Sequence, residues 1–195
     1  GTGSGKTYCF LLPMIFKLLR EAYGIGINRK PWRNFDRPYI HSPWWKDGES
    51  VYESPYGVSQ QRTAAVKCMM VYPLNALVQD QIEQFRGLFA SSTADDFYKA
   101  ELNNHKIYFG EYSGETLGKG TSARNSSEVR NKLRNAELEF DKLKRQVDNN
   151  DESADSLAKQ QNPNSSELLV RWDMQETPPD FLVTNFSMLS IMLIR

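Results

Sequence analysis

The chain begins with GTGSGKT, and this stretch constrains the possible fold more than any other. Gly3 and Gly5 leave room for backbone N–H groups to curl around phosphate oxygens. Lys6 is spaced to reach the outer phosphates of a nucleotide, and the Thr7 hydroxyl is spaced to bind Mg²⁺. A loop of this kind joins a buried strand to a helix, so the stretch predicts an α/β fold with a nucleotide site. A surface glycine turn is the alternative.

The residues after this loop predict a helix over 6–23. Its apolar content indicates a mostly buried helix, and its amino end would direct the helix dipole at bound phosphate. No strand precedes the loop, and the chain stops at Arg195 inside an apolar run. We therefore expect residues 1–195 to form a partial domain whose natural sequence continues at both ends.

The overall charge gives no reason to expect a general attraction to nucleic acids or membranes. The 195 residues carry 24 basic and 24 acidic side chains, and 39% of them are hydrophobic, which suits a soluble globular domain. The longest apolar runs, at 8–19 and 186–194, fall short of the roughly 20 residues that cross a membrane. Cys9 and Cys68 lie far apart in apolar surroundings, which favours buried, reduced thiols in a cytoplasmic protein.

Short apolar runs alternate with helical patterns along the chain, which predicts an α/β layer with a parallel sheet flanked by helices. Strands are expected at 66–72, 106–112 and 180–185, and helices at 75–89 and 187–194. One face of the 75–89 helix is apolar, with residues three or four positions apart. The members of this face are Val78, Ile82, Phe85 and Phe89.

Two segments interrupt this alternation. Residues 25–65 are rich in proline and tryptophan, and they predict a long loop whose aromatic side chains attach it to the domain surface. Residues 117–177 are highly charged and predict a second insertion that is helical or flexible. Within it, the runs DNNDESADS and KQQNPNSSE favour flexibility because they contain few apolar residues.

The second insertion contains a heptad pattern that predicts a coiled-coil-like helix over 127–147. Its apolar seam consists of Val129, Leu133, Ala136, Phe140, Leu143 and Val147. Such a seam needs a partner, which we expect to be a helical hairpin, a neighbouring domain or another protein. The alternative is a nucleic-acid clamp that uses the basic residues of the helix, although acidic residues lie between them. These basic residues are Arg130, Lys132, Arg134, Lys142, Lys144 and Arg145.

No acidic residue is placed where ATP hydrolysis would need one. A phosphate loop of this kind works with an acidic side chain at the end of a neighbouring strand, where it holds Mg²⁺. Asp180 precedes its expected strand, and the pair Asp151 and Glu152 follows two asparagines. The sequence therefore predicts no catalytic residue within 1–195.

Four stretches, in this order, resemble the first RecA-like domain of a superfamily 2 DEAD/DEAH-box helicase. TGSGKT resembles motif I, and VYPLNALVQDQ at 71–81 resembles motif Ia in the form used by the Lhr- and YprA-like branch. IYFGEYSGET at 107–116 resembles the strand and glycine turn that come next, and PPDFLVTNFSMLSIMLIR at 178–195 resembles motif Ib. In that family a DExH box follows. The resemblance implies an incomplete RecA-like P-loop NTPase domain, with both insertions outside the matching stretches.

The resemblance also implies a set of contacts. ATP and Mg²⁺ would be the cofactors, with Thr7 binding the metal, and the nucleotide would be held by Thr2, Gly3, Ser4, Gly5, Lys6 and Thr7. The nucleic-acid backbone would lie against Pro73, Leu74, Asn75, Ala76, Gly114, Thr184 and Asn185. From the residues alone, Thr184 and Asn185 also suit an ordinary helix cap. Asp80 and Gln81 are expected to brace their helix.

The leading interpretation is a piece of a bacterial ATP-dependent helicase or translocase that acts on nucleic acid, DNA rather than RNA. Such a piece would bind nucleotide weakly and hydrolyse little by itself, because a second RecA-like domain is needed to close the ATP site. A P-loop ATPase of another class and a helicase-like scaffold without turnover are the alternatives. Replacing Lys6 by Ala in the intact protein would separate a motor from a scaffold.

Overall fold

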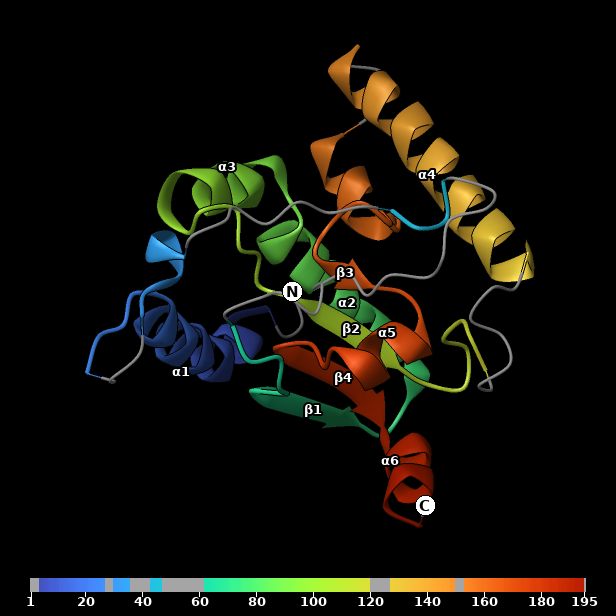
Figure 1. Ribbon diagram of the computed structural model, residues 1–195. Helices are drawn as coiled ribbons and strands as arrows, with labels where there is room; N and C mark the ends of the chain where they lie inside the picture. The colour runs from blue at the N-terminus through green and yellow to red at the C-terminus, as the bar shows by residue number, and fades with distance from the viewer. Residues whose placement is uncertain are drawn as a thin grey trace.

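The computed structural model describes residues 4–26, 30–35, 43–46, 62–119, 127–149 and 153–194, and it shows an open parallel sheet with helices around it (Figure 1). The four strands lie in the order β1-β4-β2-β3, and each neighbouring pair is parallel. Their bounds are β1 Cys68–Tyr72, β2 Phe109–Tyr112, β3 Glu167–Leu168 and β4 Phe181–Asn185. The predicted α/β fold with a parallel sheet is confirmed.

Helices flank both faces of this sheet. The α-helices are α1 Ser4–Ala22, α2 Asn75–Phe89, α3 Ser92–Glu101, α4 Ser127–Asp148, α5 Arg171–Glu176 and α6 Phe186–Ile194. Two 3-10 helices are η1 Trp32–Asn34 and η3 Ala154–Lys159. The helices predicted at 6–23, 75–89, 127–147 and 187–194 are confirmed, whereas α3 and α5 were not predicted. None of the described helices is long and apolar enough to cross a membrane.

α1 buries one face only, although the sequence predicted a mostly buried helix. Leu11, Leu18 and Ala22 lie in the core, whereas the rest of the helix surface exposes Tyr8, Phe10, Leu12, Met14 and Phe16. Cys9 is exposed on this helix, so the prediction that it is buried is wrong. Cys68 is half-buried in β1, where burial raises the pKa of its thiol.

The core between the sheet and α2 is built mainly from phenylalanine. Side chains alternate along β4, so Phe181 and Val183 face α2 while Leu182 faces α5, which lies on the other side of the sheet (Figure 1). We call Phe85, Phe89, Phe109 and Phe181 the aromatic core. All four side chains are buried, and neighbouring rings lie 5.1 to 6.1 Å apart. The apolar face predicted for the 75–89 helix is confirmed, because all its members are buried.

β3 lies inside the segment 117–177, where the sequence predicted helix or flexible chain. The run KQQNPNSSE leads into the sheet because its polar side chains find buried partners. The Ser166 hydroxyl donates to the Phe89 carbonyl at 2.8 Å. Arg86 of α2 donates two hydrogen bonds to Glu167, at 2.7 and 2.9 Å. Ser165, Ser166 and Glu167 are all buried, so the predicted flexibility is wrong for this part of the run.

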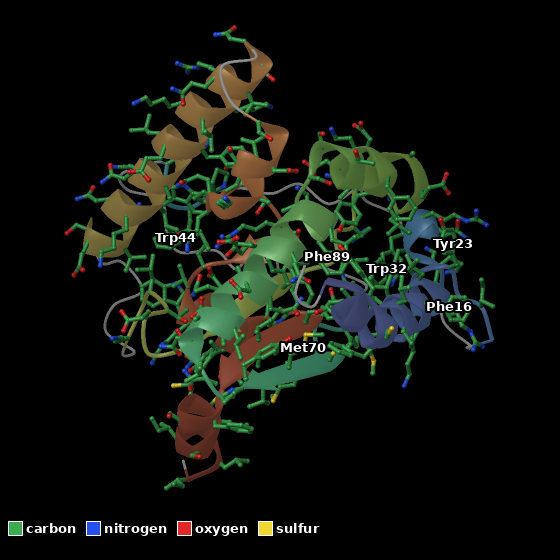
Figure 2. All side chains as sticks on the ribbon, turned by 180° about the vertical axis from the view of Figure 1, so that it is seen from behind. Phe16, Tyr23, Trp32, Trp44, Met70 and Phe89 are labelled. Atoms are coloured by element: carbon green, nitrogen blue, oxygen red, sulfur yellow. The ribbon has the colours of Figure 1, made fainter. Side chains whose placement is uncertain are left out.

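The two insertions meet in a second, smaller core under α4. Trp44 and Trp45 come from the first insertion and pack against Val129, Leu133 and Trp172. We call these five residues the tryptophan core. The Trp44 ring centroid lies 6.2 Å from that of Trp45 and 6.1 Å from that of Trp172. Figure 2 shows Trp44 beside α4 and Phe89 at the end of α2. The prediction that the aromatic side chains of this segment attach it to the domain is therefore confirmed for Trp44 and Trp45, which are buried there.

Candidate nucleotide and nucleic-acid sites

The predicted nucleotide site lies at the start of α1. This helix begins at Ser4 and includes Gly5 of the phosphate loop, and its first turn carries no acidic side chain that would repel phosphate. Thr7 is half-buried in the same turn. Thr2, Gly3 and the side chains of residues 4–6 lie outside the described residues. The described part therefore fits an anion at this helix end.

The loops predicted to contact nucleic acid gather at one edge of the sheet. Tyr72, at the end of β1, pairs with Asn185, at the end of β4. Tyr112, at the end of β2, pairs with Thr184. Because parallel strands end at the same edge, the loops that follow β1, β2 and β4 lie beside one another there (Figure 1). We call this the carboxyl edge.

The loop after β1 and the first residues of α2 are exposed. Pro73, Leu74, Asn75 and Ala76 are all exposed. α2 begins at Asn75, and Leu74, which precedes it, provides no side-chain cap. The first N–H groups of α2 therefore have no partner within the helix and can bind an anion.

Asn185 ties two of these loops together. Its Nδ2 donates to Asn75 Oδ1 at 2.5 Å, and its Oδ1 accepts a hydrogen bond from the Met188 N–H at 2.7 Å. The second bond is an ordinary cap for α6, so the cap interpretation is correct for Asn185. Because the side chain is only partly buried, the same residue still borders the carboxyl edge.

Thr184 faces the interior, unlike its neighbour. Its side chain is 0% exposed, and its hydroxyl donates to the Tyr112 carbonyl at 2.6 Å. This burial weighs against a side-chain contact with nucleic acid, and the predicted contact of Thr184 stays a prediction. Thr184 fixes the end of β4 against the end of β2.

The turn after β2 is held by its own side chains. The Ser113 N–H donates to Thr116 Oγ1 at 2.8 Å, and the Thr116 hydroxyl donates to the Glu111 carbonyl at 2.8 Å. Gly114 stands at the tip, is exposed, and has no atom within 4 Å of the position a Cβ would take. The described structure thus leaves open space next to Gly114.

Gln81 braces α2 as expected. It is buried, and its Oε1 accepts a hydrogen bond from the Tyr72 hydroxyl at 2.8 Å. This bond fixes the end of β1 against the first turns of α2. It therefore helps to set the loop between these two elements.

The basic residues of α4 are partly used within the protein. Arg130 donates to the Trp44 carbonyl at 3.1 Å, and Arg134 donates to the carbonyls of Trp45 and Lys46, both at 2.9 Å. Lys132 also pairs with Glu128 at 2.8 Å. These contacts weaken the nucleic-acid clamp hypothesis, because three of its six arginine and lysine side chains are already engaged. The partners of α4 within the described residues include the 43–46 segment and η3.

Two buried ion pairs lie at the starts of strands. Glu167 opens β3 beside Arg86, and burial raises the pKa of the Glu167 carboxyl despite this guanidinium. Asp180 precedes β4, where it accepts hydrogen bonds from Arg62 and from the Tyr108 N–H. Both acids lie away from the carboxyl edge and brace the sheet. The absence of a catalytic acid from 1–195 stays a prediction.

Sequence reasoning missed the pairing of Asn75 with Asn185 and the contacts of Arg171 with the turn after β2. The first joins residues 110 positions apart and the second joins residues 58 positions apart. Neither contact produces a periodic pattern in the sequence. The parallel order of β1, β4 and β2 was needed to bring them together.

The sequence profile of the DEAD/DEAH box helicase family matches residues 1–119. The Druantia protein DruE of Escherichia coli (strain UMEA 4076-1) is 28% identical over 232 aligned residues. This alignment covers 100% of the chain and 11% of DruE, so the chain spans a small part of that relative's length. No solved structure matches the chain.

Proposed function

The chain belongs to the DEAD/DEAH box helicase family, and from this premise we propose that it is part of an ATP-dependent motor that moves along nucleic acid. One observation carries the proposal: three loops gather at the carboxyl edge, and the first of them offers uncapped N–H groups of α2. Such groups hold a sugar–phosphate backbone without reading its bases. Membership of the Lhr- and YprA-like branch, and DNA rather than RNA as the ligand, are part of the proposal.

ATP with Mg²⁺ is the proposed cofactor. The main-chain N–H groups of Gly3–Gly5 and of the first turn of α1 would hold its phosphates. Lys6 would pair with the outer phosphates, and the Thr7 hydroxyl would bind the metal. Bound Mg²⁺ neutralises charge that develops on the transferred phosphoryl group. The residues of this chain bind and orient the nucleotide.

The test is the ATPase rate of the full-length protein, measured with and without single-stranded DNA. We expect DNA to raise the rate of the wild-type protein. Lys6→Ala should lower the stimulated rate by about a hundredfold or more, because the charge on the outer phosphates loses its fixed cation. A single-stranded RNA of the same sequence should stimulate less than DNA.

Lys17→Ala is the matched control, because Lys17 is an exposed lysine on the same helix. It should keep the wild-type rate. A wild-type protein that hydrolyses ATP equally with and without nucleic acid would contradict the proposal. Equal rates for Lys6→Ala and Lys17→Ala would contradict the assignment of the phosphate loop.

A helicase-like scaffold without turnover is the second candidate. It would use the same carboxyl edge to bind nucleic acid but would not need ATP hydrolysis. A full-length Lys6→Ala variant that retains biological activity would favour the scaffold, since a motor loses its activity with its ATPase.

A further inference from the structure

Arg171, the first residue of α5, contacts the turn after β2. Its guanidinium donates a hydrogen bond to the Ser113 carbonyl, at the start of the turn. The same guanidinium lies 5.2 Å from the centroid of the Tyr112 ring, within the range of a cation–π contact. The side chain therefore fixes both the last residue of β2 and the first residue of the turn.

The far end of the turn is also held by the start of α5. The Arg171 N–H donates to the Leu117 carbonyl at 2.9 Å, and Leu117 pairs with Val170 in an isolated parallel bridge. Gly118 then packs closely: a Cβ there would lie 2.7 Å from Val170 and 2.8 Å from Trp172. Its φ of +79° also favours glycine. The main chain on both sides of Gly114 is thus tied to one short helix.

α5 is itself anchored by the tryptophan core. Trp172, next to Arg171, is 2% exposed and packs against Trp44 of the first insertion. Gln175, one turn further along, donates to the Tyr112 hydroxyl at 2.9 Å. Arg171 is therefore held at a defined place, half-buried beneath the turn.

We propose that Arg171 is a positioning residue for nucleic-acid binding. It holds the Ser113–Thr116 turn in the conformation that brings Gly114 to the sugar–phosphate backbone. This inference rests on the proposed function, because it assumes that the carboxyl edge binds nucleic acid. A guanidinium suits the role since its planar fork donates to a carbonyl while its face lies over a ring, and an ammonium does only the first of these well.

The experiment measures the DNA concentration that gives half-maximal ATPase stimulation in the full-length protein. Arg171→Ala should raise this concentration about tenfold, because a charged hydrogen bond that orders the turn is lost. The rate at saturating DNA should stay close to wild type. Arg171→Lys should fall between the two proteins, and it serves as the test should Arg171→Ala fail to fold.

Salt dependence separates positioning from direct contact. If Arg171 bound a phosphate itself, its removal would make the plot of log binding constant against log salt concentration less steep. For a single strand, the slope would become less negative by about 0.7. A positioning residue leaves that slope unchanged. We therefore expect Arg171→Ala to bind DNA more weakly but with the same salt dependence as the wild-type protein. A less steep salt dependence would overturn the proposal.

Tyr98→Phe is the control. The Tyr98 hydroxyl also donates to a main-chain carbonyl, that of Phe89 at 3.1 Å, which lies outside both the turn and the tryptophan core. This variant should lower the melting temperature without changing the half-stimulating DNA concentration. If Arg171→Ala behaves like Tyr98→Phe, the inference fails while the proposed function stands. If DNA does not stimulate the wild-type protein, the proposed function fails, and this inference fails with it.

Discussion

The aromatic core and the tryptophan core bury similar side chains, but they are assembled differently. The aromatic core joins α2 to the two central strands, and its rings belong to a cluster of buried apolar side chains. The tryptophan core joins a short segment of the first insertion to α4 and α5. Polar bonds close it from outside: Arg130 and Arg134 donate to carbonyls of the 43–46 segment, and Lys46 pairs with Glu137 at 2.5 Å.

The sheet is thus held together by apolar packing, whereas the tryptophan core also relies on hydrogen bonds and an ion pair. The free energy gained by burying the apolar rings does not depend on charged groups. We expect the sheet to unfold as one cooperative unit. The 43–46 segment and α4 are attached by a few hydrogen bonds and the Lys46–Glu137 ion pair in addition to the tryptophan core. They should therefore come apart from the sheet at lower free energy.

The largest effect is expected in the aromatic core. Phe181→Ala removes a ring that is 1% exposed, contacts Phe85 and Phe89, and sits in a central strand. It should lower the free energy of unfolding by about 3–5 kcal/mol. Urea unfolding followed by far-UV circular dichroism measures this. Loss of hydrogen-exchange protection in α4 alone, with an unchanged urea midpoint, would contradict the distinction between the two cores.

Trp44→Ala should have a smaller and more local effect. The ring is buried, but the segment that carries it can undock without opening the sheet. We expect a loss of about 3 kcal/mol, the low end of the range for removal of a large aromatic ring, confined to the 43–46 segment and α4. Hydrogen exchange should show faster exchange in α4, while amides of β4 keep their protection. Equal loss in both elements would mean that the cores unfold together.

The smallest effect is a dependence on pH. Burial alone would raise the pKa of Glu137, but hydrogen bonds from Lys46 and Asn164 outweigh it and hold the pKa below its ordinary value. A carboxylate with a lowered folded-state pKa adds stability above its unfolded pKa of about 4.3. That stability is lost as the pH falls through the lowered value.

Hydrogen exchange of α4 at about pH 5 and about pH 3, on either side of the unfolded pKa, measures this effect. Protection of α4, corrected for the intrinsic exchange rate, should fall with acid in the wild-type protein. Glu137→Gln should remove much of the difference, because a neutral amide does not titrate. The aromatic core contains no titratable group, so β4 should change less. The same acid response in wild type and variant would contradict the role of this ion pair.

The two cores also show which parts of the fold the sequence could predict. Phe85 and Phe89 share a helical face, and β4 is a short apolar run, so spacing along the chain predicted the helix and the strand. β3 has only two residues, and one is the charged Glu167. Its place in the sheet depends on Arg86, which lies 81 positions earlier, and no local pattern encodes this.

The candidate site was predicted to a similar extent. The resemblance placed Pro73, Leu74, Asn75 and Ala76 in a loop, and the structure shows this loop exposed at the carboxyl edge. Burial of Thr184 could have been inferred from alternation, since it shares a face of β4 with Leu182 in a sheet covered on both sides. The role of Arg171 could not, because it depends on the tertiary contact of α5 with the turn.

The most direct test of the account concerns the carboxyl edge. Asn75→Asp keeps the oxygen that accepts from Asn185 Nδ2, yet it places a negative charge where phosphates should lie. Asn131→Asp makes the same chemical change at an exposed position of α4 and is the control. The measurement is the DNA concentration that half-stimulates the ATPase of the full-length protein. We predict a rise of about tenfold for Asn75→Asp and none for Asn131→Asp. The same value for both variants would contradict the account.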